Sequence, residues 1–541
     1  MNIRSSSFQL FLQFLLLLLV VIALYAESLS APFVFDDFAF FSSPDNLTKY
    51  SNSSFSFSLR WLPYTSLVQT THWLGVDVFW LRLGNVLLHA LNAITLFFLL
   101  RQLFRVTLGN VESSNTISAS LSWFAFFAAL IFALHPVAVY GVTYLIQRSI
   151  LMATLFVLLM LWAYLQGLLR GGWQWMASAT LLYFAAVYSK EHSIAAPGVA
   201  LALTFLVRKP SLALFRYLAP YYILCALIAI SVVYATSKMG ILATAYEPNG
   251  IGILELSAAK HGVTDVSNAF PLSILTQSFL FFKYLGLWLL PNPAWMSVDM
   301  REPFALSLLS WPHTLGLVAF LSYPCATIWL LLKQGRMGLL GFALLFPWLL
   351  FLTELSTVRA QEPFVLYRSY LWMPGLLAAL PVVCASLAPK RAFILLGVLA
   401  VLLVPLSLNR LNTFSSALLL WDDAEKLVRD KHNMPGVERI YSNRGHELGQ
   451  LKRYKEAIAD FTTAIAIYPG YDTFYSDRAT AHYLLGQYYE ALLDYNRAIA
   501  ITSKNPISYN GRALTYLALG DNKSAQEDFD KSCALGLCPQ N

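Results

Sequence analysis

Long apolar stretches separated by short polar connectors occupy the first three quarters of the chain, and the last quarter is polar with a helical repeat. Eleven apolar stretches approach the length that a helix needs to cross a bilayer of about 30 Å. They fall at 8–25, 79–100, 120–137, 149–168, 173–189, 194–207, 212–236, 314–332, 338–353, 370–388 and 392–408. This pattern predicts about eleven membrane-spanning helices. A further apolar stretch, 272–291, would break the alternation of connectors as a full span, so we interpret it as a re-entrant or interfacial helix.

Composition supports the same class of protein. Of the 541 residues, 57% are hydrophobic and 12% are charged, whereas a soluble domain carries about 25% charged residues. The chain is therefore expected to be a multi-span membrane protein. Its net charge of +7 is explained by basic residues in connectors on one side of the membrane, so it does not indicate nucleic-acid binding.

The distribution of charge predicts the orientation of the chain. With a cytoplasmic amino terminus, the short basic connectors fall on the cytoplasmic side and the carboxyl-terminal tail lies outside. Of the fourteen Asp and Glu residues before 408, thirteen then lie on the outer side, and Glu112 is the exception. The first apolar stretch is alternatively a signal peptide cleaved near "SLSA" (28–31), which would detach the following loop from its anchoring helix.

The polar tail contains a repeat with a period of 34 residues. Tyr441, Tyr475 and Tyr509 begin equivalent segments, and small residues (Gly445, Ala479, Ala513, Ala457, Ala491, Ala525) and aromatic residues (Phe461, Tyr495, Phe529) recur in phase. This is the tetratricopeptide pattern, in which small residues allow two helices to approach closely. We therefore divide the chain into a membrane domain (1–408), a helical connector (409–436) and about three repeats (437–541). Such an α-solenoid presents a surface for partner proteins.

An acidic pair, Asp36 and Asp37, interrupts the otherwise aromatic and aliphatic segment "FVFDDFAFF" directly after the first apolar stretch. Two adjacent carboxylates repel each other and are costly near a membrane unless water or a cation compensates them. The pair is therefore either an ordinary polar loop or a catalytic element in the first outer loop.

Several segments together resemble a known family. They are "FVFDDFAFF", "RLGNVLLHALNA" (82–93), "ALHPVAVYGVTYLIQRSILMATLF" (133–156), "YSKEHSIAAPGVAL" (188–201), "YLGLWLLPNPAWMSVD" (284–299) and "YRSYLWMPG" (367–375). Their order, with the repeats, resembles the transmembrane and tetratricopeptide-repeat proteins, which belong to the GT-C superfamily of lipid-linked-sugar glycosyltransferases. Eukaryotic members carry many more repeats, so the chain looks like a bacterial relative, and their sugar and acceptor do not transfer to it.

The resemblance implies an inverting glycosyltransferase that takes sugar from a polyprenyl phosphate on the outer face of the plasma membrane. The departing phosphate is stable as an anion, so the enzyme needs a base for the acceptor hydroxyl and cations for the phosphate. In GT-C enzymes the first acid of the first-loop acidic motif usually acts as the base, which favours Asp36, and Asp37 would orient a cation or the sugar. Carboxylates also suit Mg²⁺ or Mn²⁺, and metal dependence stays open.

Cations at the outer ends of other spans are candidates for the phosphate, and Glu191, beside Lys190, is a further candidate for substrate binding. We expect Arg148, Lys190 and Arg368 to share one cavity with Asp36. Alternatively, Arg148 or Arg368 extends to the membrane interface without binding substrate. Lys190 could instead form an ion pair with Glu191. His135, before Pro136, is a weaker candidate and fits the end of a helix better. Arg82, Asn85 and His89 share one helical face and are interpreted as structural.

Three acceptor classes or roles remain open. Transfer to Ser or Thr of a protein acceptor engaged by the repeats is the first choice. The alternatives are transfer to a lipid or envelope polysaccharide, and a non-catalytic membrane scaffold for envelope assembly. Cys533 and Cys538 are close enough in sequence to pair in an oxidising compartment.

Overall fold

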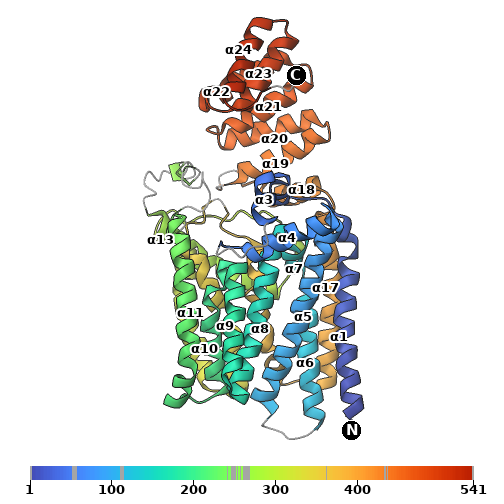
Figure 1. Ribbon diagram of the computed structural model, residues 1–541, viewed down its shortest axis with the longest axis vertical. Coiled ribbons are helices and arrows are strands. Elements are labelled where there is room, and N and C mark those ends of the chain that lie inside the picture. The colour runs from blue at the N-terminus through green and yellow to red at the C-terminus, as the bar shows by residue number, and fades with distance from the viewer. Residues whose placement is uncertain are drawn as a thin grey trace.

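The computed structural model describes residues 3–51, 58–109, 115–240, 242–244, 252, 254–255, 258–259, 268–360, 362–431, 434 and 436–538. In these ranges the chain is helical, with one isolated antiparallel bridge between Met300 and Phe364 and no strand. The predicted all-α class is confirmed: a membrane-sized helical bundle is followed by a helical solenoid (Figure 1). Glu112, the acid expected on the cytoplasmic side, lies outside the described residues.

The bundle is built from long apolar helices. Their bounds are α1 Ile3–Tyr25, α5 Val78–Leu108, α6 Asn115–Leu134, α7 Pro136–Thr143, α8 Arg148–Arg170, α9 Trp173–Ser189, α10 Ala196–Val207, α11 Leu212–Lys238, α13 Ala269–Leu289, α14 His313–Leu332, α15 Gly335–Phe351 and α17 Pro389–Thr413. Within the described part of the chain, eight helices are long and apolar enough to cross a membrane, or nine if α6 and α7, bent by 60°, count as one. The chain is therefore a multi-pass membrane protein.

The predicted number of spans is higher than the number of full-length helices. The stretch 173–189 forms a helix of 17 residues, α10 has 12 residues, and the stretch 370–388 consists mainly of 3₁₀ turns and the four-residue α16, Leu380–Val383. Prolines at the start of α10, of the 3₁₀ segment Met373–Ala379 and of α16 account for part of this, because proline lacks the N–H that continues a helix.

Helix α13 contains most of the stretch 272–291, and its contacts place both of its ends on the same side of the bundle. Near its first turn, Ser273 donates to the carbonyl of Thr357, directly after the 3₁₀ segment Leu352–Ser356 that follows α15. Near its last turn, Trp288 donates to Ser369 and stacks on His135 at the bend between α6 and α7. By length alone α13 is a candidate span, but these contacts agree with the interfacial interpretation.

The acidic pair and the repeats lie at the same end of the bundle. The amino-terminal end of α1 is at the opposite end, and the short helices α2 Asp36–Ser42, α3 Pro44–Ser51 and α4 Trp61–Leu74 form a layer between the bundle and the solenoid (Figure 1). The predicted common side of the acidic pair and the repeats therefore agrees with the structure. We call this side the outer end after the predicted orientation, which stays a prediction.

The solenoid consists of three helix pairs that follow the connector helix α18, Ala417–Val428. The pairs are α19 Val437–Gln450 with α20 Tyr454–Ile467, α21 Asp472–Leu484 with α22 Tyr488–Ile501, and α23 Pro506–Ala518 with α24 Asn522–Ala534. Small residues face aromatic rings as the sequence predicts. At Gly445, for example, an added Cβ would come within 2.9 Å of the Phe461 ring, so the two helices of the first pair approach closely there.

Each repeat also carries the same ion pair between its two helices. The guanidinium nitrogens of an Arg donate to both carboxylate oxygens of an Asp sixteen residues later, at 2.7–2.8 Å, in the pairs Arg444–Asp460, Arg478–Asp494 and Arg512–Asp528. Such two-point contacts are stronger and more specific in geometry than a single hydrogen bond.

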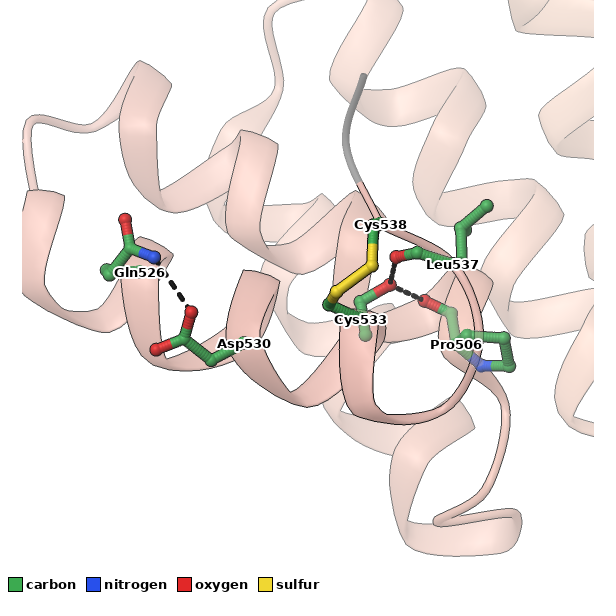
Figure 2. Close-up of a disulfide and its surroundings, with 7 residues drawn as sticks. Pro506, Gln526, Asp530, Cys533, Leu537 and Cys538 are labelled. Atoms are coloured by element: carbon green, nitrogen blue, oxygen red, sulfur yellow. Dashed lines mark hydrogen bonds between the residues drawn. A yellow bond between two sulfur atoms is a disulfide. The ribbon is translucent and has the colours of Figure 1, made fainter. Parts of the chain in front are cut away.

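A disulfide closes the end of the solenoid. Cys533 in the last turn of α24 is bonded to Cys538 (Figure 2), as the spacing of these residues allowed. Next to it, the Ser532 hydroxyl bonds the carbonyls of Pro506 and Leu537, at 3.0 and 2.9 Å. These bonds join the turn after α24 to the start of α23.

Candidate active site

The loop before the acidic pair is fixed by one buried arginine. Arg82, in α5, is fully buried, and its guanidinium donates to the carbonyls of Ser28, Ala31, Pro32 and Thr143. Three of these carbonyls precede the acidic pair and the fourth ends α7. The structural role predicted for Arg82 is confirmed, because it joins the loop to the bundle.

The acidic pair follows a strained turn. The Asp37 N–H donates to the Val34 carbonyl at 3.1 Å, and Phe35 has φ 56° and ψ −132°. These angles match the first central position of a type II′ turn, which normally requires glycine, so a phenylalanine there needs support from its surroundings. The Phe35 ring stacks on Trp421 at 5.4 Å and meets Tyr144 edge-on at 5.7 Å.

Asp36 is the exposed member of the pair. Its carboxylate accepts a hydrogen bond from the Tyr144 hydroxyl at 2.8 Å. Although its side chain reaches solvent, surrounding protein raises the pKa of Asp36 above its usual value, and the Tyr144 bond and the charge of Arg439 offset part of this rise. A raised pKa favours proton acceptance, so Asp36 has both the exposure and the basicity of a general base.

Asp37 points away from solvent and cannot touch a substrate. It is 0% exposed, and its carboxylate accepts the N–H groups of Leu145 and Ile146 at 3.2 and 3.0 Å. Burial raises the pKa of Asp37 to about 7, and the backbone bonds and Arg82 offset part of the rise. The prediction that Asp37 orients a cation or the sugar is therefore wrong. The side chain instead joins the acidic loop to the segment between α7 and α8.

We expect Asp37→Asn to lower stability rather than to remove a catalytic group. An amide can accept from one of the two backbone N–H groups but presents its own donors to the other, and an unsatisfied buried donor costs about 1–3 kcal/mol. Thermal unfolding of the purified protein in detergent should show a clear decrease in Tm. An unchanged Tm with lost activity would instead indicate a direct chemical role for Asp37.

Arg148 is committed to structural hydrogen bonds. It is buried at the start of α8, and its guanidinium donates to Asn85 Oδ1, the Leu81 carbonyl and the hydroxyls of Ser66 and Thr70. These partners occupy all three of its nitrogens. The prediction that Arg148 binds the donor phosphate is therefore wrong, because the side chain holds α4, α5 and α8 together.

His135 is also structural. Its Nδ1 accepts the Val137 N–H at 3.3 Å as the N-cap of α7, its Nε2 lies 3.1 Å from the Trp288 carbonyl, and its ring stacks on the Trp288 ring. A substrate-binding role for His135 is contradicted by these contacts and by its burial. The alternative interpretation, a helix-end residue, is the one that agrees with the structure.

Lys190 and Glu191 each bond a different partner instead of forming an ion pair with each other. The Lys190 ammonium donates to Gln147 at 3.1 Å and lies 5.5 Å from the ring centre of Tyr367, whose ring meets that of Tyr144. Burial lowers the pKa of Lys190 well below its usual value. Glu191 accepts instead from Arg60, with Nε to Oε2 at 3.1 Å. Lys190 is thus connected to Asp36 through Tyr367 and Tyr144.

Arg368 is buried in an ion-pair network and is not on a lipid-facing rim. Its guanidinium donates to Glu354 at 3.0 Å, and the same carboxylate group lies 3.0 Å from His192 and 3.8 Å from Arg359. Glu354 itself is fully buried. Arg368 therefore contributes positive charge to this region while it positions Glu354.

A cavity of about 530 Å³ opens beside this network, between the 3₁₀ turn Glu191–Ala195, α11 and the 3₁₀ turn Leu352–Ser356. Its lining is mostly apolar, and its polar residues include Arg60, Glu191, His192 and Arg359. Within the described residues the lining includes Glu191 but not Arg148, Lys190 or Arg368. Asp36 does not line this cavity either, so a cavity shared by the three cations and Asp36 stays a prediction.

Sequence reasoning missed several residues of this region: Arg60, Tyr144, His192, Glu354, Arg359 and Arg439. Glu354 could have been recognised as a candidate from the sequence, because it is an acidic residue at the end of an apolar stretch. As for a metal, the two carboxylates of the acidic pair have different partners, and the described residues contain no group of three or more His, Cys, Asp or Glu side chains arranged to hold an ion.

Comparison with family models matches the solenoid. Tetratricopeptide-repeat models match residues 438–471 and 507–535, and a further TPR-repeat model matches 479–520. These matches confirm that the tail consists of tetratricopeptide repeats. They cover less than half of the chain and leave the membrane domain unassigned.

Comparison with curated proteins finds no match. Among solved structures, the arabinofuranosyltransferase AftD from mycobacteria is similar at 18% identity with a TM-score of 0.35, over 80% of this chain and 30% of that one. Yeast Tom70 is similar at 12% identity with a TM-score of 0.19, over 78% of this chain and 74% of that one. The chain thus spans less than a third of AftD, and scores this low carry no argument about fold or activity.

Proposed function

We propose that the protein is a membrane glycosyltransferase that moves a sugar from a polyprenyl-phosphate donor to an acceptor hydroxyl at the outer end of the bundle. The observation that carries this proposal is the arrangement of Asp36. An exposed carboxylate with a raised pKa is connected, through Tyr144, Tyr367 and Lys190, to a cationic region beside an apolar cavity. A base, a phosphate-binding region and a lipid-binding cavity are the three parts that this reaction needs.

The reaction assigned to this site is a single displacement. The acceptor oxygen forms a bond to the anomeric carbon while the bond from that carbon to the phosphate oxygen breaks. The electron pair leaves with the phosphate, and the acceptor proton passes to Asp36. Attack opposite the leaving group inverts the anomeric centre, and no general acid is needed because the phosphate leaves as a stable anion.

The charge balance around the cavity fits an anionic lipid. The network beside it contains more arginines than carboxylates: Arg60, Arg359 and Arg368 against Glu191 and Glu354. A phosphate supplies the missing negative charge, and fixed cations stabilise the charge that develops as the phosphate leaves. The apolar lining of the cavity accommodates the first isoprene units of the lipid.

The position of the repeats favours a protein acceptor. They lie at the end of the bundle that carries α3 and α4 (Figure 1), and α3 contacts α2, which begins with Asp36. Tetratricopeptide repeats present a surface for partner proteins. Transfer to Ser or Thr is therefore the first choice. The outer face of a bacterial plasma membrane fits the disulfide Cys533–Cys538, because disulfides persist in oxidising compartments. Transfer to a lipid or envelope polysaccharide uses the same base and donor site.

The proposal is tested by comparing envelope proteins and glycolipids by mass spectrometry in cells that contain the protein, lack it, or carry Asp36→Asn. A glycan that disappears in both altered strains supports the enzyme, and the molecule that loses it identifies the acceptor. A glycan profile unchanged in both strains would favour the non-catalytic scaffold.

The donor site makes a separate prediction. We expect Arg60→Met and Ala195→Phe to weaken binding of undecaprenyl phosphate by about tenfold or more, because the first removes a cation and the second fills the cavity with a larger side chain. Native mass spectrometry of the purified protein measures the bound lipid. Lys333→Met, an exposed cation after α14 at the opposite end of the bundle, is the matched control. Equal binding by all three variants would contradict a lipid site in this cavity.

A further inference from the structure

The first repeat reaches into the region of the acidic pair through one side chain. Arg439, in the first turn of α19, forms an ion pair with Glu362, and its guanidinium lies 4.6 Å from the centre of the Phe35 ring. Its side chain is 26% exposed. Its charge also acts on Asp36, the residue that follows Phe35. One arginine of the repeat array thus touches the turn that presents the proposed base.

Phe35 depends on this support. Its backbone conformation is costly for any residue with a side chain, by about 1–3 kcal/mol. Its ring is packed between Trp421 of the connector helix and Arg439, and it contacts an apolar cluster that includes Val437 and Ile440 of the first repeat. The connector and first repeat therefore supply the contacts that hold the ring in place and offset the strain.

We propose that Arg439 is a positioning residue for the Asp36 carboxylate, so that the first tetratricopeptide repeat is part of the active site and not merely a platform for the acceptor. This inference rests on the proposed function for the role of Asp36 as a base. The geometry of the turn, however, is independent of the reaction.

Arg439 acts on Asp36 in two ways. The stacked guanidinium fixes the Phe35 ring and hence the direction of the next side chain, and its positive charge stabilises the ionised carboxylate. The other titratable and charged groups around Asp36 and Arg439 are Asp37, Tyr144, Tyr367, Asp299, Glu362 and Arg301, the last of which pairs with Asp299. Glu362 opposes Arg439, because its negative charge raises the pKa of Asp36.

Titration of Asp36 by carboxyl footprinting tests the electrostatic role without any assay of transfer. A carbodiimide with glycine ethyl ester labels protonated carboxyl groups, and peptide mass spectrometry at a series of pH values gives the midpoint for Asp36 in the full-length protein. Arg439→Met should move this midpoint upward by about one pH unit, since an opposite charge is lost. Glu362→Gln should move it downward, and Arg439→Lys should leave it near that of the unaltered protein.

Hydrogen–deuterium exchange of the segment 33–42 tests the positioning role. The Asp37 N–H is protected by its bond to Val34, so Arg439→Met should accelerate its exchange by about tenfold while exchange in α20 to α24 is unchanged, which shows that the array still folds. Arg453→Met removes an exposed ion pair of the same repeat and is the matched control. An unchanged Asp36 midpoint together with unchanged exchange in Arg439→Met would overturn the inference. Failure of the glycosyltransferase proposal alone would leave both measurements as expected.

Discussion

Replacing Asp36 with asparagine should lower sugar transfer by about 10²–10⁴-fold, the usual contribution of a positioned base, and leave the fold intact. The side chain is exposed and shares one hydrogen bond with Tyr144, so loss of its charge removes little from the folded state. Transfer from a radiolabelled undecaprenyl-phosphate sugar to acceptor in membranes is the measurement, with thermal unfolding as the check on folding.

Asp45→Asn is the matched control for this experiment. Asp45 lies in α3 of the same outer layer and is also exposed, so its replacement changes the local charge by the same amount. Sugar transfer by Asp36→Asn at the rate of the unaltered protein would show that Asp36 is not the base. Equal loss in both variants would indicate an effect of overall surface charge.

The largest effect on stability is expected for Glu354→Gln. Glu354 is fully buried and is the carboxylate shared by Arg368, Arg359 and His192. Without its charge, Arg368 is left as a buried cation lacking its carboxylate, and breaking a buried ion pair in this way costs about 3–5 kcal/mol. The purified variant should unfold at a clearly lower temperature in detergent, and it should also bind less undecaprenyl phosphate because Arg359 and His192 line the cavity.

A double substitution separates this explanation from a general loss of packing. Glu354→Gln combined with Arg368→Gln removes both charges, so it should cost less stability than Glu354→Gln alone. Glu456→Gln, in an exposed pair with Arg453, should leave Tm unchanged. A double variant less stable than the single variant would show that the network is held by shape and hydrogen bonding more than by charge.

The helices of the membrane domain and the repeats of the tail could be predicted from the sequence. Apolar stretches of membrane length and a 34-residue period each arise from local chain properties, so they can be read without tertiary information. The stretches 194–207 and 370–388 were predicted as spans because hydropathy does not register where a proline starts a helix or where a chain turns into 3₁₀ structure. The interfacial interpretation of α13, which its contacts favour, came from counting the connectors on each side, a constraint that acts on the whole chain.

The site was less predictable, because identical residue types take opposite roles in it. Asp36 and Asp37 are adjacent, and the turn at Phe35 exposes one and buries the other. Arg148 and Arg368 both follow patterns expected of a phosphate ligand, yet the carbonyl and amide partners that occupy Arg148 come from a different helix. Arg439 stands among the many charged residues of a repeat array, and no local pattern sets it apart from those on the surface.

The contact between the first repeat and Phe35 changes how a deletion of the array is interpreted. Removing 437–541 would separate a protein acceptor from a lipid acceptor if the repeats served the acceptor alone. The same deletion removes Arg439 and the cluster around Phe35, so transfer to either acceptor should fall. A truncation that removes α23 and α24 retains this support and is the better test of the acceptor.

The ion pair within each repeat affects how whole repeats can be gained or lost during evolution. Arg444–Asp460, Arg478–Asp494 and Arg512–Asp528 each join the two helices of one unit, with no residue borrowed from the next. The same arginines also bond the preceding unit, with Arg478 donating to Thr462 and Arg512 to Asn496. A duplicated unit therefore brings both its own closure and its bond to the unit before it. Gene duplication can lengthen such a tail in steps of 34 residues, whereas the first unit, tied to the membrane domain through Arg439, is the one that such events must leave in place.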